Sequence, residues 1–222
     1  MTRPAEPAAV AEPELARFTR PVRWVHGLVG GLMLVCIATA AVLYNGSLAV
    51  LAGHRHLVEL VHVWCGFALP VPLLVGLVSR SYRADLRRLN RFTPRDRQWL
   101  RSRTRRDGRI PVGKFNAGQK INGALSAGAI AVLLVSGTVM YSTGWAPLPW
   151  RTGATFMHDW FALAVGLLVV GHVRFALGDP VAMRSLRTGT VPQRWARQEH
   201  GAWAAEHSGT AGEPRSGPGS PD

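Results

Sequence analysis

The sequence predicts an all-α protein, an integral membrane four-helix bundle with both termini in the cytoplasm. Four apolar stretches are each long enough to cross a hydrocarbon core ~30 Å thick as a helix of about 20 residues. The hydrophobic residues, 47% of the 222, are gathered in these stretches and separated by charged loops. Most of the positive charge lies on one side of the predicted membrane, and the two loops on the other side hold only Arg55 and Arg151. The spans fall at about 22–44, 57–79, 121–141 and 156–177.

The chain carries a net charge of +13, and its distribution predicts the orientation. Loop 80–120 holds fourteen Lys and Arg residues against three acids, and the flanks outside the first and fourth spans are also basic. Because Lys and Arg are retained on the cytoplasmic side, this basic loop and both termini are predicted to be cytoplasmic. The same residues favour contact with anionic membrane lipid. Since topology accounts for the charge, no nucleic-acid partner is expected.

The two ends of the chain differ in composition from its centre. Residues 1–17 are rich in Pro, Ala and Glu, and residues 208–222 in Gly, Pro and Ser, so both tails are predicted to be disordered. Residues 18–207 are then one membrane domain. The start lacks the apolar core of a signal peptide, and the first apolar run is expected to stay in the membrane. Cys36 and Cys65 fall inside predicted spans and are expected to be inert.

Local signals place the remaining elements in order. Pro21 suits the first turn of the first helix, where its missing N–H is not needed. The basic loop contains a short amphipathic helix over about 83–89, and Thr93 followed by proline predicts the N-cap of a second one. The outer loop 142–155 carries two tryptophans and suits a membrane interface. The tail after the fourth span is expected to form one surface helix.

Two histidines lie in the fourth stretch, His158 and His172, fourteen residues apart. Fourteen residues turn an α-helix by about 1400°, within about 40° of a whole number of turns, and advance it by roughly 21 Å. Both rings therefore leave nearly the same face, one near each membrane surface. His62 lies near the outer end of the second span and His26 near the inner end of the first. Each depth thus has two histidines, on different helices.

Facing imidazoles from two helices of a bundle can hold haem iron between them. The matched depths therefore predict two haems b, the outer on His62 and His158 and the inner on His26 and His172. Ionisable residues inside spans are rare and usually functional, although a structural role for any one of them is the alternative. Zinc is less suitable, because it would need about four ligands at one depth. Covalent attachment of haem is not expected, because the sequence has no C-x-x-C-H motif. The residue four positions after each histidine is small, which leaves room for a porphyrin: Gly30, Gly66, Ala162 and Ala176.

The other histidines lie outside the predicted spans. His54 and His56, in the short outer loop, are spare candidates for the outer haem in place of His62, should the second span be displaced by a turn or two. His200 and His207, in the tail, are expected to be solvated.

Five motifs stand along the chain from about residue 18 to 206: RFTRPVRWVH, HVWCGF, KFNAGQK, MHDW with GHV, and GTVPQRWARQEHGAW. Together they resemble the gamma, or cytochrome b, subunits of membrane-bound formate dehydrogenases and the related b-type subunits of hydrogenases. KFNAGQK and the tail motif are the most specific. Gly27 departs from the pattern, because the family usually has an aromatic residue after the first histidine, and this leaves the branch of the family open.

The resemblance implies four transmembrane helices, two haems b and a quinone site near the inner haem. Its haem ligands correspond to His26, His62, His158 and His172 in the pairs given above. Its quinone pocket corresponds to Asn116, Gly118 and Gln119, beside His172. An ordinary helix-entry turn is the alternative interpretation of Asn116–Gly118.

On this resemblance the chain is expected to be a multi-pass subunit of the bacterial plasma membrane. It would pass electrons from an iron–sulfur beta subunit, fed by a molybdopterin catalytic subunit, to menaquinone or ubiquinone. No formate-oxidising site of its own is expected. The alternatives are the same role for a hydrogenase or another molybdopterin enzyme, and a haem-free membrane anchor. A small transporter fits less well, since it would favour polar residues at the midplane.

Overall fold

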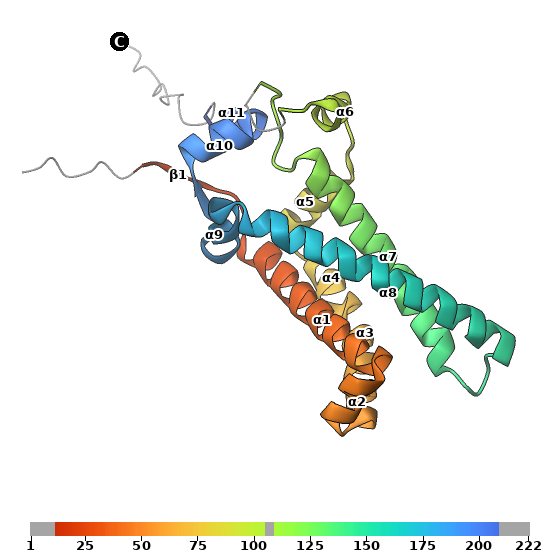
Figure 1. Ribbon diagram of the computed structural model, residues 1–222. Coiled ribbons are helices and arrows are strands. Elements are labelled where there is room, and N and C mark those ends of the chain that lie inside the picture. The colour runs from red at the N-terminus through yellow and green to blue at the C-terminus, as the bar shows by residue number, and fades with distance from the viewer. Residues whose placement is uncertain (1–11, 105–108, 209–222) are drawn as a thin grey trace, which may run out of the picture.

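Four long apolar helices form the body of the molecule (Figure 1). A computed structural model describes residues 12–104 and 109–208. Within them, four helices are long and apolar enough to cross a membrane, the second of them in two pieces. This confirms the predicted all-α four-helix membrane fold. The helices are α1 (Arg20–Tyr44), α3 with α4 (Arg55–Ala68 and Pro70–Gly76), α7 (Ala117–Tyr141) and α8 (Leu148–Leu177).

The second span begins two residues earlier and ends three residues earlier than predicted, and it is interrupted once. Pro70 stands at the first position of α4, and because proline has no N–H to donate, the ladder of α3 stops at Ala68. The span ends at Gly76 rather than at 79. A Cβ on Gly76 would lie 2.8 Å from the side chain of Val25 and 2.9 Å from the ring of Tyr82. Only glycine therefore lets the end of α4 pack so closely against its neighbours.

The fourth helix begins eight residues before the predicted span, so half of the expected outer loop 142–155 is helical. Pro147 is its N-cap and a second proline lies in its first turn, where proline is well tolerated. The first two turns contain proline, glycine, Arg151 and two threonines, and for this reason the hydropathy of the sequence did not include them. A short helix, α2 (Gly46–Ala52), joins α1 to α3 at the same end of the bundle.

The two helical pairs, α1 with α3–α4 and α7 with α8, meet along a narrow apolar core. Its buried residues are Met33, Leu69, Ala129, Ile130 and Val165. The opposite faces carry large exposed hydrophobic side chains, such as Leu74, Val135 and Phe175. In a membrane protein such faces contact lipid. They can do so because the backbone polar groups are hydrogen-bonded within the helices.

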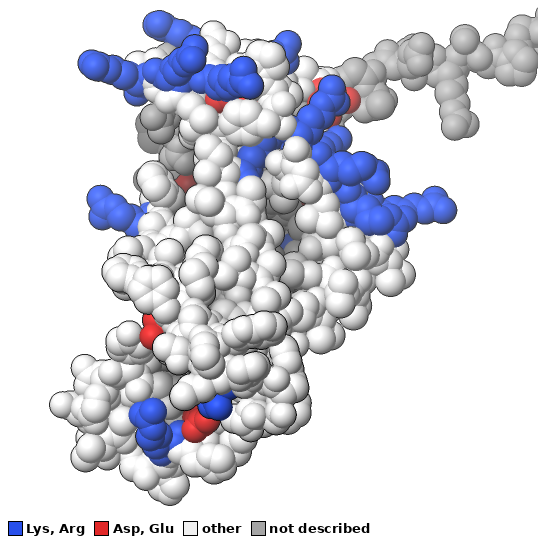
Figure 2. Space-filling view, turned by 90° about the vertical axis from the view of Figure 1, so that its right-hand side faces the viewer, with Lys and Arg blue, Asp and Glu red and all other residues white. Residues whose placement is uncertain are grey.

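The remaining elements gather at the other end of the bundle, which we call the cap (Figure 1). The predicted helix over 83–89 is α5, and the predicted N-cap Thr93 begins α6 through a capping box with Asp96. The tail holds three short helices and a strand where one surface helix was expected. Figure 2 shows Lys and Arg concentrated toward the cap end, above a long middle part with few charged residues. The cap consists of β1 (Glu14–Ala16), α5 (Arg80–Asn90), α6 (Pro94–Arg101), α9 (Pro180–Thr188), β2 (Thr190–Pro192), α10 (Gln193–Glu199) and α11 (Gly201–Ser208).

Strands β1 and β2 pair in an antiparallel register, with Leu15 opposite Val191. This corrects the prediction of a disordered tail over 1–17, because residues 14–16 belong to the cap. The other predicted disordered residues, 1–11 and 209–222, lie outside the described part of the chain. The strand pairing brings both described ends of the chain to one end of the bundle, together with loop 80–120. Which side of the membrane this end faces stays a prediction.

His200 is buried in the cap, so the expectation that it is solvated was wrong. It is 3% exposed, donates from Nδ1 to the Gly113 carbonyl (2.7 Å) and accepts at Nε2 from the Arg17 guanidinium (2.9 Å). Burial lowers the pKa of Arg17 to about 10. His207 is exposed, as expected. The Arg17–His200 contact ties the N-terminal strand segment to the C-terminal helices.

Two buried ion pairs fix the basic loop to the start of α7. Lys114 Nζ lies 2.6 Å from Asp85 on α5, and Lys120 Nζ lies 2.8 Å from Asp96 on α6. Burial lowers the pKa of Lys114, against the opposing effect of Asp85. Burial alone would raise the pKa of Asp96, but hydrogen bonds from Lys120 and Thr93 hold it below its usual value. The two lysines flank the N-A-G-Q segment and position it against the cap.

Candidate functional site

The four predicted histidines form two pairs, one toward each end of α8. The rings of His62 on α3 and His158 on α8 have centroids 6.2 Å apart and planes at 70°. The rings of His26 on α1 and His172 on α8 are also 6.2 Å apart, with planes at 48°. We call these the outer and the inner pair, after the predicted orientation. Their role as haem ligands stays a prediction.

The spare candidates for the outer pair are not part of it. His54 is the N-cap of α3, and His56 lies in the first turn of that helix. Both are exposed. The histidine that the structure brings to His158 is His62, one and a half turns further along α3.

The spacing of both pairs fits bis-imidazole binding of one metal ion. An imidazole nitrogen binds a metal at about 2 Å, and the ring centre lies about 1 Å behind it, so two opposed ligands place their ring centres about 6 Å apart. A Cβ on Gly30 or on Gly66 would have no neighbouring atom within 4 Å, so there is room beside both helices for a porphyrin. Within 12–104 and 109–208, no three His, Cys, Asp or Glu side chains gather as a zinc site would require.

Each outer histidine has a hydroxyl partner on the neighbouring helix that the sequence did not reveal. Thr39 Oγ1 of α1 lies 2.9 Å from His62 Nδ1. Ser136 Oγ of α7 lies 3.1 Å from His158 Nδ1, and Ser136 is 6% exposed. Hydroxyl residues within the apolar spans were the available sequence signal for these partners. Which of them contact a histidine depends on how the helices pack, and the sequence alone does not give this. With Nδ1 occupied in this way, Nε2 of each ring is left for a metal.

The ring of His158 packs against α7 at Gly137. A Cβ at this position would lie 3.2 Å from His158 Cε1, closer than most Cβ contacts. We expect Gly137→Val to displace the ring and to lower haem retention at the outer site by about tenfold or more, as for changes beside metal ligands. Haem content after size-exclusion chromatography would measure the loss. Gly128→Val is the matched control, since its Cβ would meet nothing within 4 Å. Equal haem content in the two variants would contradict the prediction.

The predicted quinone residues begin α7 as a reciprocal capping box. Asn116 N–H donates to Gln119 Oε1 (3.0 Å), and Gln119 N–H donates to Asn116 Oδ1 (2.9 Å). A Cβ on Gly118 would lie 3.3 Å from Asn116 Oδ1 and 3.5 Å from the ring of Trp99. The segment is therefore a helix entry, which was the alternative interpretation. Because the box uses only the side-chain oxygens, the two NH₂ groups remain as donors for a ligand.

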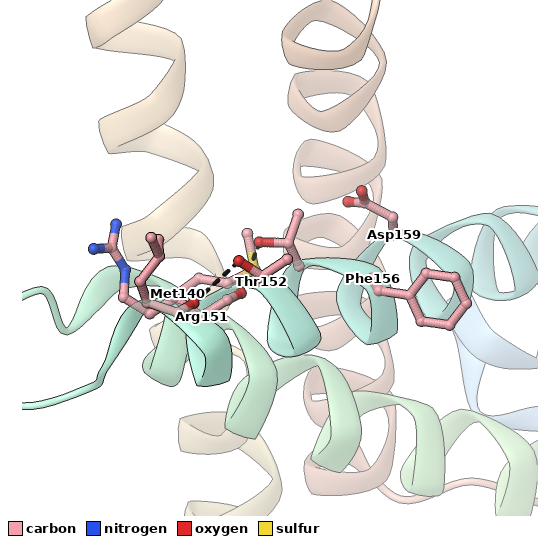
Figure 3. A pocket seen from close by; sticks show the side chains of 7 residues that line it. Met140, Arg151, Thr152, Phe156 and Asp159 are labelled. Atoms are coloured by element: carbon pink, nitrogen blue, oxygen red, sulfur yellow. Dashed lines mark hydrogen bonds between the residues drawn. The ribbon is translucent and has the colours of Figure 1, made fainter.

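Two hollows lie at opposite ends of the described molecule. One, about 480 Å³, is in the cap and is lined by Lys114, Phe115, Ala117 and Lys120 among others, but not by Asn116, Gly118 or Gln119. The other, about 460 Å³, lies at the α2 end between α7 and α8 (Figure 3). Its wall includes Arg151 and Asp159, and Asp159 accepts a hydrogen bond from the Tyr44 hydroxyl (3.3 Å).

A four-helix membrane bundle with facing imidazole pairs at two depths defines a class of protein, the membrane-bound cytochromes b. The model of the prokaryotic cytochrome b561 family matches residues 17–188, and the chain belongs to this family. It is therefore a multi-pass bacterial membrane protein of a kind that binds haem b.

The chain is also similar to curated relatives. One is the formate dehydrogenase cytochrome b556(fdo) subunit of Escherichia coli strain K12. Proteins of the same name in E. coli O6:H1 and E. coli O157:H7 match equally. Each is 28% identical over 98 residues, which cover 43% of this chain and 46% of the relative. The match thus spans about half of the length of these relatives.

Proposed function

We propose that this chain is the di-haem cytochrome subunit of a formate dehydrogenase-like complex, and that it passes electrons from an iron–sulfur partner across the membrane to quinone. One observation carries the proposal: the structure forms two imidazole pairs, and in each pair the ring centroids are 6.2 Å apart. The members on α8, His158 and His172, are fourteen residues apart, which separates the pairs by roughly 21 Å along the helix axis. When bound, each haem supplies a one-electron carrier. A chain of two such carriers spans most of a ~30 Å hydrocarbon core.

The histidines hold the carriers, and the bundle insulates them. His62 and His158 would bind the outer haem, and His26 and His172 the inner one. The apolar core that joins the helical pairs keeps water from the space between them.

Asn116 and Gln119 would bind the quinone at the cap end. Their NH₂ groups can donate to a quinone carbonyl, while the capping box holds both side chains in place. Reduction of the quinone to quinol takes two electrons, delivered one at a time, and two protons. With the predicted orientation, the protons come from cytoplasmic water and the electrons from the outer side, so turnover separates charge across the membrane.

Asn116→Asp and Gln119→Glu test this quinone site. Each keeps the oxygen that closes the capping box and removes the NH₂ donor. We expect kcat/KM for quinone to fall about tenfold or more, because one donor to the reacting oxygen is lost, while haem content and haem reduction by the electron donor stay unchanged. Stopped-flow reoxidation of the reduced complex by a menaquinone analogue would measure the change. Wild-type reoxidation in the double variant would exclude these residues from the site.

The partner enzyme is proposed from the relatives, which are named as formate dehydrogenase subunits. The hydrogenase alternative shares the same fold and haem chemistry. Purification of the native complex distinguishes the two: haem b that becomes reduced on adding formate supports the proposal, and haem b reduced by hydrogen but not by formate contradicts it. The haem-free anchor would give no reason for two histidine pairs at metal-binding distance.

A further inference from the structure

The hydrogen of the Thr39 hydroxyl is already committed to the backbone of its own helix. Thr39 Oγ1 donates to the carbonyl of Val35 at 2.7 Å, with Cys36 O at 3.0 Å. In the contact of 2.9 Å with His62 Nδ1, the hydroxyl oxygen must therefore accept, and Nδ1 must carry the proton. This fixes the tautomer of His62 and leaves the lone pair of Nε2 available.

Ser136 does the same for the other ring of the pair. Its Oγ donates to the carbonyl of Val132 at 2.7 Å, with Leu133 O at 3.3 Å, and accepts from His158 Nδ1 at 3.1 Å. The two hydroxyls lie on α1 and α7, while the histidines lie on α3 and α8. Each outer histidine is thus held by the helix packed beside its own.

The inner pair lacks this arrangement. Within the described part of the chain, the hydroxyl–histidine hydrogen bonds are those of the outer pair, and no side-chain hydroxyl is bonded to His26 or His172. The two pairs therefore have the same ring spacing but different surroundings at Nδ1. A hydrogen bond donated by Nδ1–H raises the basicity of an imidazole ligand. A more basic ligand stabilises oxidised iron and lowers its reduction potential.

We propose that Thr39 and Ser136 are positioning residues that orient the outer histidine pair and set the outer haem at a lower potential than the inner haem. The proposal rests on the proposed function in one respect, that both pairs hold haem. It adds the residues that would favour the proposed direction of transfer, because electrons move toward the haem of higher potential. The difference in potential between the two haems would then favour electron transfer toward the cap end even before quinone accepts electrons.

Thr39→Val with Ser136→Ala tests the proposal in the purified complex. Each change removes the acceptor at Nδ1 with little change in shape. We expect the lower-potential haem b component to shift upward in a spectroelectrochemical titration. A tenfold change in its ratio of reduced to oxidised iron corresponds to about 59 mV for a one-electron couple. The higher-potential component should stay where it is, so the two components should move closer together.

Two controls separate the hydroxyl contact from general disturbance. Thr138→Val removes a hydroxyl of α7 that, among the described residues, bonds the Leu134 carbonyl at 2.7 Å and no histidine, so both potentials should stay unchanged. The second control, Thr39→Ser with Ser136→Thr, keeps a hydroxyl acceptor at both positions and should give the same titration as the wild-type protein. Should the double variant lose its outer haem, the single variants are titrated instead, each with an expected upward shift of the same component.

Unchanged potentials in a haem-replete double variant, or an equal shift of both components, would overturn this inference. The proposed function fails differently: wild-type protein would bind no haem b, or would bind two haems and fail to reduce quinone. In the second case the titration still decides the role of Thr39 and Ser136.

Discussion

His158→Ala is expected to remove the outer haem and halve the haem b content, from about two per chain to about one. The ring of His158 lies 6.2 Å from that of His62 and is held by Ser136 on α7. Changes to groups that only orient a ligand already cost about 10–100-fold in metal affinity, so loss of the ligand itself should exceed that. Pyridine haemochrome analysis of purified protein would measure the ratio, and electron transfer from the donor to quinone should stop.

The controls for this variant are histidines outside the outer pair. His54→Ala and His56→Ala change exposed residues outside the pair and should retain about two haems. His172→Ala should leave one haem as well, but the remaining spectrum and potential should be those of the outer site. Two haems in His158→Ala protein, or the loss of one in His56→Ala protein, would show that the outer ligands are wrongly assigned.

The second large effect is expected from Lys114→Met, which breaks a buried ion pair. Lys114 Nζ lies 2.6 Å from Asp85, and the two side chains are 11% and 8% exposed. Removing one member leaves a charge buried without its partner, which destabilises a protein by about 3–5 kcal/mol. The ammonium also lies over the rings of Phe18 and Phe115, 5.2 and 5.7 Å from their centroids, so cation–π attraction is lost too. Denaturation of the detergent-solubilised complex would measure the difference.

Arg88→Met is the matched control for this prediction. Arg88 forms an ion pair with Glu206 in the same cap, but these side chains are 46% and 57% exposed, so its loss should cost less than about 1 kcal/mol. Lys114→Met with Asp85→Leu should recover much of the loss, because no charge is then left buried. If Lys114→Met and Arg88→Met destabilise the complex equally, the Lys114–Asp85 pair has no special role in the cap.

The helices and the histidine pairs could be predicted because they follow from local rules. A spacing of fourteen residues places two side chains on one face of any α-helix, so His158 and His172 had to project alike. Long apolar runs specify spans in the same direct way. The alternative helix-entry interpretation of Asn116 was also local, and the capping box agrees with it.

The features that were missed depend on residues far apart in the chain. His200 is buried because Arg17, 183 residues away, reaches it across the cap, and nothing near His200 in the sequence signals this. Strand β1 has its partner at Thr190–Pro192. Thr39 and Ser136 resemble other hydroxyl residues of the spans, and only the packing of α1 on α3 and of α7 on α8 selects them.

The pairing of β1 with β2 has a consequence for how the protein is made. The ribosome releases Glu14–Ala16 early, but their partners Thr190–Pro192 emerge only after all four spans have been synthesised. During translation the N-terminal segment must therefore wait, unpaired, while the helices enter the membrane one by one. The cap can therefore close over the bundle only after the fourth span has been synthesised. Contacts between such distant segments form slowly, so closure of the cap is expected to follow insertion of the helices.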